Sequence, residues 1–374
     1  MTTFATADER WAGMGPYYAM FPIAFSNAVV DSFTDPGDVV IDPFAGRASS
    51  IFSAAVSGRR GVGVEINPVG WVYGKTKLHP AHRQDVTARL HALVETANGT
   101  STDDVSHLPR FFRACFDRAT LRFLTTARRE LDWRRSITDR TLMAFILVYL
   151  HGKRGQSLSN QMRQSKAMSP DYSVKWWREH NLRPPRIDIC DFLQQRIAWR
   201  YAKGVPTVTA STLLLGDSSR VLNSVTASIS SAKLLFTSPP YSGVTSYHYD
   251  QWLRLWLLGF GDHPARDGSF HAGKFESQQR YRALLSDVFG KCSLLMDPAG
   301  AVYVRTDARP RTLDITREVL REVFPSWTMR LSRKPMTRHS QTALFGDKSQ
   351  KPGEIDLILQ GPKAGRRVFR MHRR

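Results

Sequence analysis

The chain has 374 residues and a mass of 42.4 kDa, which suits one large domain or one domain with a long insertion. Hydrophobic residues make up 42% and charged residues 23%, which excludes wholesale disorder. The longest apolar run, residues 142–150, is too short for a membrane-spanning helix, which needs roughly 20 residues. The first eleven residues hold no apolar signal core, so we expect a cytoplasmic protein. Cys115, Cys190 and Cys292 have neither disulfide nor zinc spacing, and we expect reduced thiols.

The charge predicts the kind of partner. Lys and Arg number 53 against 33 Asp and Glu, which gives a formal net charge of +20 and a pI near 10.3. Such an excess predicts a polyanion as partner, and nucleic acid is the first candidate. A basic tail is the simpler explanation, but it holds only five arginines, at 366, 367, 370, 373 and 374. Residues 75–205 alone hold 24 basic and 12 acidic residues, so the charge belongs to the folded body.

The hydrophobic pattern predicts an α/β fold. We expect a β-branched strand at residues 39–41, a helix at 49–56 and a second strand at 61–66, with a glycine-containing turn after the first strand. This order predicts a parallel βαβ unit. Residues 75–205 give only helical patterns. Further strands are predicted at 212–215, 233–237, 301–304, 327–331 and 355–359, with helices at 284–296 and 313–323. We therefore expect a Rossmann-like, doubly wound sheet of about seven strands with a largely helical insertion. The expected units are 1–74 and 206–362 for the two halves of the core, 75–205 for the insertion and 363–374 for a basic tail.

The loop after the first strand has the character of a cofactor site. Residues 42–49 (DPFAGRAS) stand at the carboxyl end of that strand, where α/β folds bind nucleotides, and Gly46 allows a ligand to approach the backbone. Glu65, at the end of the second strand, is placed to bind two ribose hydroxyls. The loop has neither G-x-G-x-x-G nor G-K-[ST], which favours an adenosine ligand without phosphates over NAD or ATP. Any βαβ unit has a glycine turn, so the spacing alone leaves an ordinary turn possible.

A second candidate site follows a later strand at the same edge. Residues 237–241 read TSPPY, and the two prolines fix the backbone. The Ser238 hydroxyl and the Pro239 carbonyl can then stand as a pair of acceptors, with the flat ring of Tyr241 beside them. This combination suits a planar group that carries an exocyclic amine. A rigid turn with a core tyrosine is the alternative.

Together, the motifs DPFAG, GVGVEINP, GDSS and TSPPY resemble the S-adenosylmethionine-dependent DNA amino-methyltransferases, which modify N4 of cytosine or N6 of adenine. Residues 22–78 and 213–241 carry the resemblance, and residues 353–357 resemble the last strand of that fold. The resemblance implies a site without metal whose catalytic motif is Ser238, Pro239, Pro240 and Tyr241. It implies that the cofactor S-adenosyl-L-methionine is bound by Tyr18, Phe21, Asp42, Phe44, Gly46, Glu65, Ile66, Asp217 and Ser218. Ala48, where many members have a second glycine, is a departure that we expect to be tolerated.

The resemblance also suggests the reaction. The acceptors of the SPPY motif would localise the lone pair of an aromatic amine and aim it at the sulfonium methyl group. The base must first be flipped out of the duplex. Because the family's SPPY members mostly modify cytosine, Ser238 favours N4 of cytosine, and N6 of adenine is the alternative. Enzymes that methylate carbon 5 of cytosine use a cysteine nucleophile, which in that family follows a proline. None of the three cysteines of this chain follows a proline, so this class of enzyme is excluded. An RNA methyltransferase, a non-catalytic DNA-binding protein of this fold and a nicotinamide oxidoreductase remain as further alternatives.

The expected partner is double-stranded DNA, engaged by the helical insertion. Trp176, Trp177, Arg178 and the pair Lys153-Arg154 are the candidate contacts, with residues 247–252 and the basic loop 334–351 as further ones. A cognate restriction endonuclease is a potential companion. The sequence leaves open the recognition site, the oligomeric state and whether that endonuclease exists.

Overall fold

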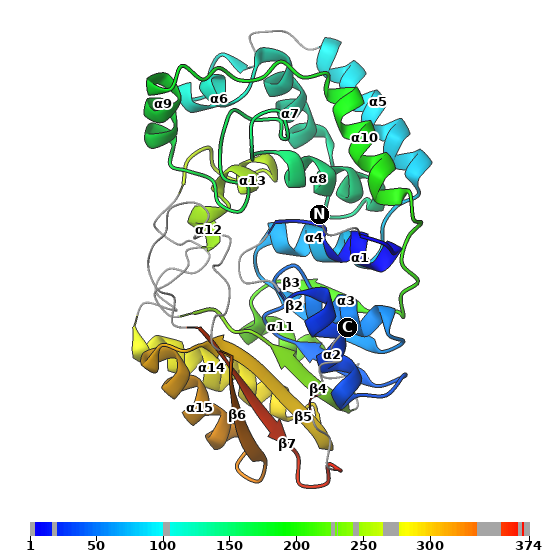
Figure 1. Cartoon of the computed structure of the whole chain (residues 1–374), viewed down its shortest axis with the longest axis vertical. Helices are drawn as coiled ribbons and strands as arrows, with labels where there is room; N and C mark the ends of the chain where they lie inside the picture. Colours follow the sequence, from blue (N-terminus) through cyan, green and yellow to red (C-terminus); the bar gives the residue numbers. More distant parts are fainter. Residues whose placement is uncertain are drawn as a thin grey trace.

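The computed structural model describes residues 4–16, 21–99, 105–225, 229, 231–241, 247–264, 277–334, 353–365 and 369. Its centre is a seven-stranded sheet in the order β3-β2-β1-β4-β5-β7-β6 (Figure 1). The strands are β1 (Val39–Asp42), β2 (Arg60–Glu65), β3 (Thr212–Leu215), β4 (Ala232–Thr237), β5 (Met296–Asp307), β6 (Thr328–Lys334) and β7 (Glu354–Gln360). The first five run parallel, and β7 is antiparallel to both β5 and β6. The order reverses beside β1, which is where doubly wound sheets bind their ligands.

Successive strand residues point to opposite faces of the sheet, and both faces are covered, so the strands are apolar at consecutive positions. Val40, Leu234 and Tyr303 point to one hydrophobic cluster, whereas their neighbours Ile41 and Leu235 point to another. The GVGV run of β2 follows the same rule. A Cβ added to Gly61 or Gly63 would lie 2.6 or 2.8 Å from the side chain of Ile51, so the glycines let the preceding helix, Ser49–Val56, pack closely on the strand.

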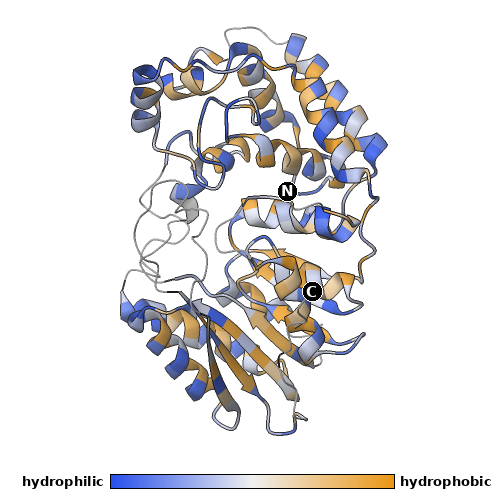
Figure 2. Ribbon diagram, viewed as in Figure 1, coloured by the Kyte–Doolittle hydropathy of each residue, from blue (hydrophilic) through white to orange (hydrophobic). Residues whose placement is uncertain are grey.

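Helices cover both faces of the sheet. On one face lie α2 (Ile23–Phe33), α3 (Ser49–Val56) and α4 (Pro68–Leu78). On the other lie α11 (Ser218–Val225), α14 (Gln278–Ser293) and α15 (Pro310–Val323). The apolar colouring of Figure 2 follows the strands and the inner sides of these helices. The short helix α1 (Ala7–Ala12) packs beside α3 and the last helix of the insertion.

The remaining helices form a second layer above α4 (Figure 1). They are α5 (Arg83–Gly99), α6 (Arg110–Cys115), α7 (Arg118–Glu130), α8 (Ile137–Tyr149), α9 (Pro170–Glu179) and α10 (Ile189–Tyr201), joined by α12 (Tyr247–Asp250) and α13 (Trp252–Leu257). Arg254 of α13 is fully buried. Its guanidinium donates to the carbonyls of Leu147 and Gln164 and to the Gln251 side chain at 2.7–2.9 Å, and these hydrogen bonds hold α13 against the helical layer.

The predicted fold class is confirmed, and all seven predicted strands are present. The strand predicted at 301–304 is longer at both ends, and the helix predicted at 284–296 begins and ends earlier. The expected boundary between residues 74 and 75 falls inside α4, which belongs to both the core and the helical layer. The three cysteines are free, as expected. Among the described helices, none combines the length and apolar character that crossing a bilayer would require.

Candidate cofactor and substrate site

Asp42 holds the two halves of the core together at the carboxyl edge of the sheet. Its side chain is 2% exposed and accepts hydrogen bonds from the Phe44 amide at 3.0 Å and the Thr237 hydroxyl at 2.6 Å. The Ser50 hydroxyl is a third donor. Asp42 thereby joins the end of β1 to the start of α3 and to the residue before Ser238. Our sequence analysis missed the roles of Ser50 and Thr237, because nothing in their spacing shows that they meet one carboxyl group.

Burial dominates the electrostatics of this carboxyl group. It raises the pKa of Asp42 from 3.8 to about 6, while the hydrogen bonds from Ser50, Thr237 and the Phe44 amide oppose the shift. The desolvation cost of a charge with no bulk water nearby exceeds the gain from these three donors. A proton on Asp42 is therefore exchanged near neutral pH, within reach of the candidate catalytic turn.

Two further carboxylates end the neighbouring strands. Glu65, the last residue of β2, pairs with Leu215 of β3, and the Gly216 amide donates to the Glu65 carbonyl at 2.9 Å. Asp217 thus lies directly before α11 and beside the end of β2, and its carboxylate accepts from the amide and hydroxyl of Ser219. Glu65 is 6% exposed and accepts from the Asn67 amide at 2.8 Å. Asp42, Glu65 and Asp217 therefore stand at the ends of three adjacent parallel strands.

This set of acceptors fits S-adenosylmethionine. Its ribose hydroxyls, adenine amine and methionine ammonium are all donors, and carboxylates at one edge can receive them. The buried Asn67 Nδ2 beside Glu65 has no hydrogen-bond partner among the described residues, which leaves a donor for a ligand acceptor. Gly46, with a φ of 54°, gives the loop a turn that glycine adopts without strain.

Ala48 takes the same left-handed conformation without glycine's freedom. Its φ is 59° and its side chain is fully buried, while it serves as the N-cap of α3. A non-glycine residue in this region costs roughly 1–2 kcal/mol. The backbone at Ala48 is therefore strained, and the expectation that the cofactor loop tolerates this residue stays a prediction.

The SPPY turn follows β4 directly beside this edge. The hydroxyls of Ser238 and Tyr241 lie 3.5 Å apart, so the first and last residues of the motif close over the same turn. Pro239 is buried, whereas Ser238, Pro240 and Tyr241 are partly exposed. Through Thr237 the turn is hydrogen-bonded to Asp42, and the predicted cofactor and catalytic motifs are therefore brought together.

The other predicted cofactor residues have mixed surroundings. Phe44 and Ile66 are half-buried at the sheet edge. Phe21 is 8% exposed and stacks on Phe236 at 4.6 Å between ring centroids, which places its ring in the core under α2. Ser218 is also buried, and its hydroxyl donates to the Pro43 carbonyl, a contact that ties α11 to the loop. Tyr18 lies outside the described residues.

Several candidate DNA contacts belong to the core instead. Trp177 is 2% exposed, and its Nε1 donates to the Gln161 carbonyl at 2.6 Å, so the prediction that it contacts DNA is wrong. Trp252 and Gln251 are equally buried, because α12 and α13 close the helical layer. Trp176 is partly buried and stacks on His180 at 4.3 Å.

Arg178 and the pair Lys153-Arg154 are exposed, as a backbone contact requires. Most of the basic loop 334–351 lies outside the described residues. No group of three or more His, Cys, Asp or Glu among the described residues is arranged to hold a metal ion.

Residues 4–69 match the family model of DNA methylases. This segment contains the loop 42–49, Glu65 and Ile66, but ends before the helical layer and the SPPY turn. The match supports methyl transfer as the chemistry and S-adenosylmethionine as the cofactor.

A curated relative points the same way. The chain is 32% identical over 83 residues to the protein named "Putative methylase YubD" of Escherichia coli (strain K12). The match covers 22% of this chain and 32% of that relative, so the chain spans about a third of the length of the relative it matches.

The solved structures found are distant. A TehB-like SAM-dependent methyltransferase from Corynebacterium glutamicum has 8% identity and a TM-score of 0.31, with 90% of this chain and 88% of that chain covered. The rRNA methyltransferase aviRa from Streptomyces viridochromogenes has 10% identity and a TM-score of 0.34, with 96% of each chain covered. The fold assignment rests on the strand order and not on these similarities.

Proposed function

We propose that the protein is a DNA methyltransferase that transfers a methyl group from S-adenosylmethionine to N4 of a cytosine flipped out of double-stranded DNA. One observation carries the proposal: the SPPY turn is hydrogen-bonded through Thr237 to Asp42, beside the loop that fits the cofactor. Acceptors for an amine and acceptors for an adenosine thus share one edge of the sheet. The match of residues 4–69 to DNA methylases supports the choice of chemistry.

The residues of this chain prepare the amine. S-adenosylmethionine, when bound, supplies a methyl group on a positively charged sulfur. Glu65 would accept the ribose hydroxyls and Asp217 the adenine amine. The Ser238 hydroxyl and the Pro239 carbonyl would accept the two N–H bonds of the base and so localise its lone pair, and the partly exposed Tyr241 would stack on the ring. The rigid Pro239-Pro240 backbone keeps these acceptors in place without a cost of ordering at each turnover.

Asp42 takes a positioning role in this scheme. Its carboxyl group fixes the residue before Ser238 at one end and the cofactor loop at the other. With a pKa of about 6, this carboxyl group changes its protonation state in the mildly acidic range. Removing the carboxylate would therefore disturb cofactor and substrate together.

Serine in the motif is the feature that favours cytosine over adenine. The charge of +20 supports a nucleic acid as the substrate but does not separate DNA from RNA, because both are polyanions. A cognate restriction endonuclease would be the expected companion of a site-specific enzyme. A non-catalytic protein of this fold would be expected to lose Glu65, Asp217 or the SPPY acceptors, and the chain retains all of them.

The test is to incubate the full chain with unmethylated DNA and S-adenosylmethionine, digest the DNA to nucleosides and identify the product by mass spectrometry. We expect N4-methylcytosine, and a loss of at least tenfold in rate for Ser238→Ala, because one of the two acceptors is removed. Ser224→Ala removes an exposed serine hydroxyl on α11 and serves as the matched control.

N6-methyladenine as the product would retain the mechanism and reject cytosine as the base. Methylation of RNA but not of DNA would reject the DNA substrate. Full activity of Ser238→Ala would reject the role given to the serine hydroxyl.

A further inference from the structure

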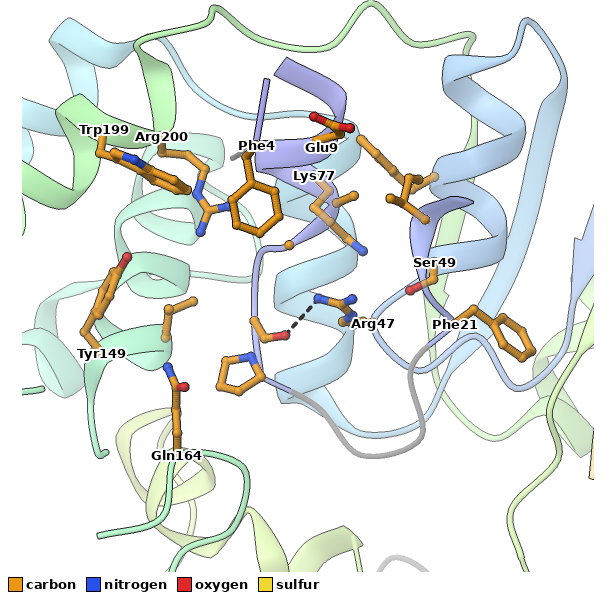
Figure 3. Close-up of a pocket in the computed structure, with 17 residues that line it drawn as sticks. Phe4, Glu9, Phe21, Arg47, Ser49, Lys77, Tyr149, Gln164, Trp199 and Arg200 are labelled. Atoms are coloured by element: carbon orange, nitrogen blue, oxygen red, sulfur yellow. Dashed lines mark hydrogen bonds between the residues drawn. The ribbon is translucent and has the colours of Figure 1, made fainter. Parts of the chain in front are cut away.

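A cavity of about 500 Å³ lies between the core and the helical layer (Figure 3). It is lined by residues of α1, α2, α3, α4, α8 and α10, by the segment before α2, and by Arg47 and Gln164 from loops. Among the described residues assigned above to the cofactor, Phe21 is the one that lines it. Arg47 and Ser49 of the loop 42–49 also line it, so the cavity adjoins the cofactor loop, whereas Asp42, Glu65 and Asp217 are not among its described lining residues.

Three buried cations face this cavity from three different elements. Lys77 is 0%, Arg200 4% and Arg47 8% exposed. The Lys77 ammonium and the Nε atoms of both arginines have no hydrogen-bond partner among the described residues. Buried charges are normally paired, so three cations with unused donors around one cavity need an explanation.

The surrounding residues do not neutralise these charges. Glu9 is the one acid among the described lining residues, and its carboxylate already accepts from the amides of Ala5 and Thr6 at 2.7 and 3.2 Å. Burial, followed by the charges of Arg47 and Arg200, holds the pKa of Lys77 well below its usual value. The two guanidinium groups thus disfavour the protonated form of Lys77, and an anion in the cavity would favour it.

Hydrogen bonds to the backbone position the Arg47 guanidinium at the cavity. One of its terminal nitrogens donates to the carbonyls of Met14 and Gly15 at 3.2 and 3.0 Å, which fixes the guanidinium plane and leaves Nε unused. In the view of Figure 3, Arg47 and Lys77 lie on one side of the Phe4 ring, and Arg200 lies on the other side with Trp199 and Tyr149. The cavity is large enough for more than a single small ion.

We propose that this cavity is a phosphate-binding site, in which Arg47, Lys77 and Arg200 hold the phosphate group of a nucleotide. A phosphate offers several strong acceptor oxygens and up to two negative charges, which suits three basic side chains around one cavity better than a single carboxylate does. The nucleotide could be free or part of a nucleic acid strand, and the chemistry at the three cations is the same. The proposal goes beyond the proposed methyl transfer and does not depend on it.

The test measures phosphate binding without any methyl donor. The melting temperature of the full chain is recorded in increasing inorganic phosphate, against sodium chloride of equal ionic strength. We expect a phosphate-specific rise for the wild type, and a loss of roughly tenfold or more in phosphate affinity for Lys77→Met, since a charge-assisted hydrogen bond is removed. Without phosphate, Lys77→Met should melt no lower than the wild type, because an unpaired buried charge is gone.

Lys363→Met removes an exposed lysine elsewhere on the surface and should bind phosphate like the wild type. If Lys77→Met does not fold, Lys77→Gln replaces it, since glutamine keeps a donor but not the charge. Competition with adenosine monophosphate and with a short single-stranded oligonucleotide then separates the two sources of phosphate. A wild type that responds equally to phosphate and chloride, a Lys77→Met variant that keeps its affinity, or displacement of phosphate by S-adenosylmethionine would each overturn the proposal.

Discussion

Replacing Asp42 by asparagine tests whether a buried carboxyl group at the site is maintained at a cost in stability. Asparagine is close in shape and can still accept from the Phe44 amide and the Thr237 hydroxyl, while its amide group can donate to Ser50. The substitution thus removes the charge and retains the hydrogen bonds. Any change in the pH dependence of folding then reports on the charge.

The magnitude follows from the pKa. In the folded protein the pKa of Asp42 is about 6, against an ordinary 3.8. Between these values the folded state retains a proton that the unfolded chain has lost, so the free energy of unfolding falls as the pH rises. The full pKa shift of Asp42 corresponds to a loss of ~3 kcal/mol in the free energy of unfolding. About 2 kcal/mol of this loss occurs between pH 4.5 and 7.5.

The assay is urea unfolding at several pH values from 4.5 to 7.5, followed by circular dichroism. Other groups titrate alike in both proteins, so the difference between them isolates Asp42. We expect the wild type to lose ~2 kcal/mol more than Asp42→Asn across this interval. We also expect the variant to transfer methyl groups more slowly at pH 7.5. Asp171→Asn, at an exposed position in the first turn of α9, is the control.

Parallel pH curves for Asp42→Asn and the wild type would refute the reasoning. They would mean that the three donors outweigh burial and that the folded protein holds the carboxylate ionised at no cost.

The remaining predictions concern packing and charge. Gly70→Ala should weaken S-adenosylmethionine binding without unfolding the protein, because the new Cβ would lie 2.7 Å from a carbonyl of the loop after β1; calorimetry measures the affinity. Gly290→Ala, in open space on α14, should instead stabilise the protein by roughly 0.5–1 kcal/mol in urea. Asp356→Asn should lower the free energy of unfolding by about 3 kcal/mol, because the buried Arg305 loses its bidentate partner. Glu354→Gln, at the exposed end of the same network, should lower it by less than about 1 kcal/mol. The affinity for DNA, measured by titration, should fall steeply between about 50 and 200 mM salt, because contacts to phosphate release bound counterions. An affinity that stays constant over this range would contradict the role given to the net charge.

The fold was largely predictable because its signals are local. The β-branched run at 39–41, the GVGV strand and the proline and glycine turns each depend on residues that are close in sequence. The helical character of residues 75–205 was clear for the same reason. Element ends were less certain, because pairing with a neighbouring strand extends β5 beyond its apolar centre.

The helical layer shows what such patterns omit. The aromatic residues around 176 and 252 could equally line a DNA surface or a core, and their composition is the same in both cases. Burial of Trp252 depends on α13 returning to the insertion after the SPPY turn, where the Trp252 Nε1 donates to the carbonyl of Met168, 84 residues earlier; Trp177 is buried against Phe111 of α6. The position of Lys77 on α4 gave no sign that its ammonium would be enclosed with two arginines.

The sequence by itself determined the chemical identity of the candidate site: carboxylates after three strands, a fixed pair of acceptors in SPPY and a basic body. These follow from residue types and from the rule that parallel strands end at one edge. Only the tertiary structure decided that Thr237 and Ser50 meet Asp42, that burial raises the pKa of this carboxyl group, and that three cations share a cavity. Desolvation and charge repulsion depend on what surrounds a group in three dimensions, and that information is not carried by spacing along the chain.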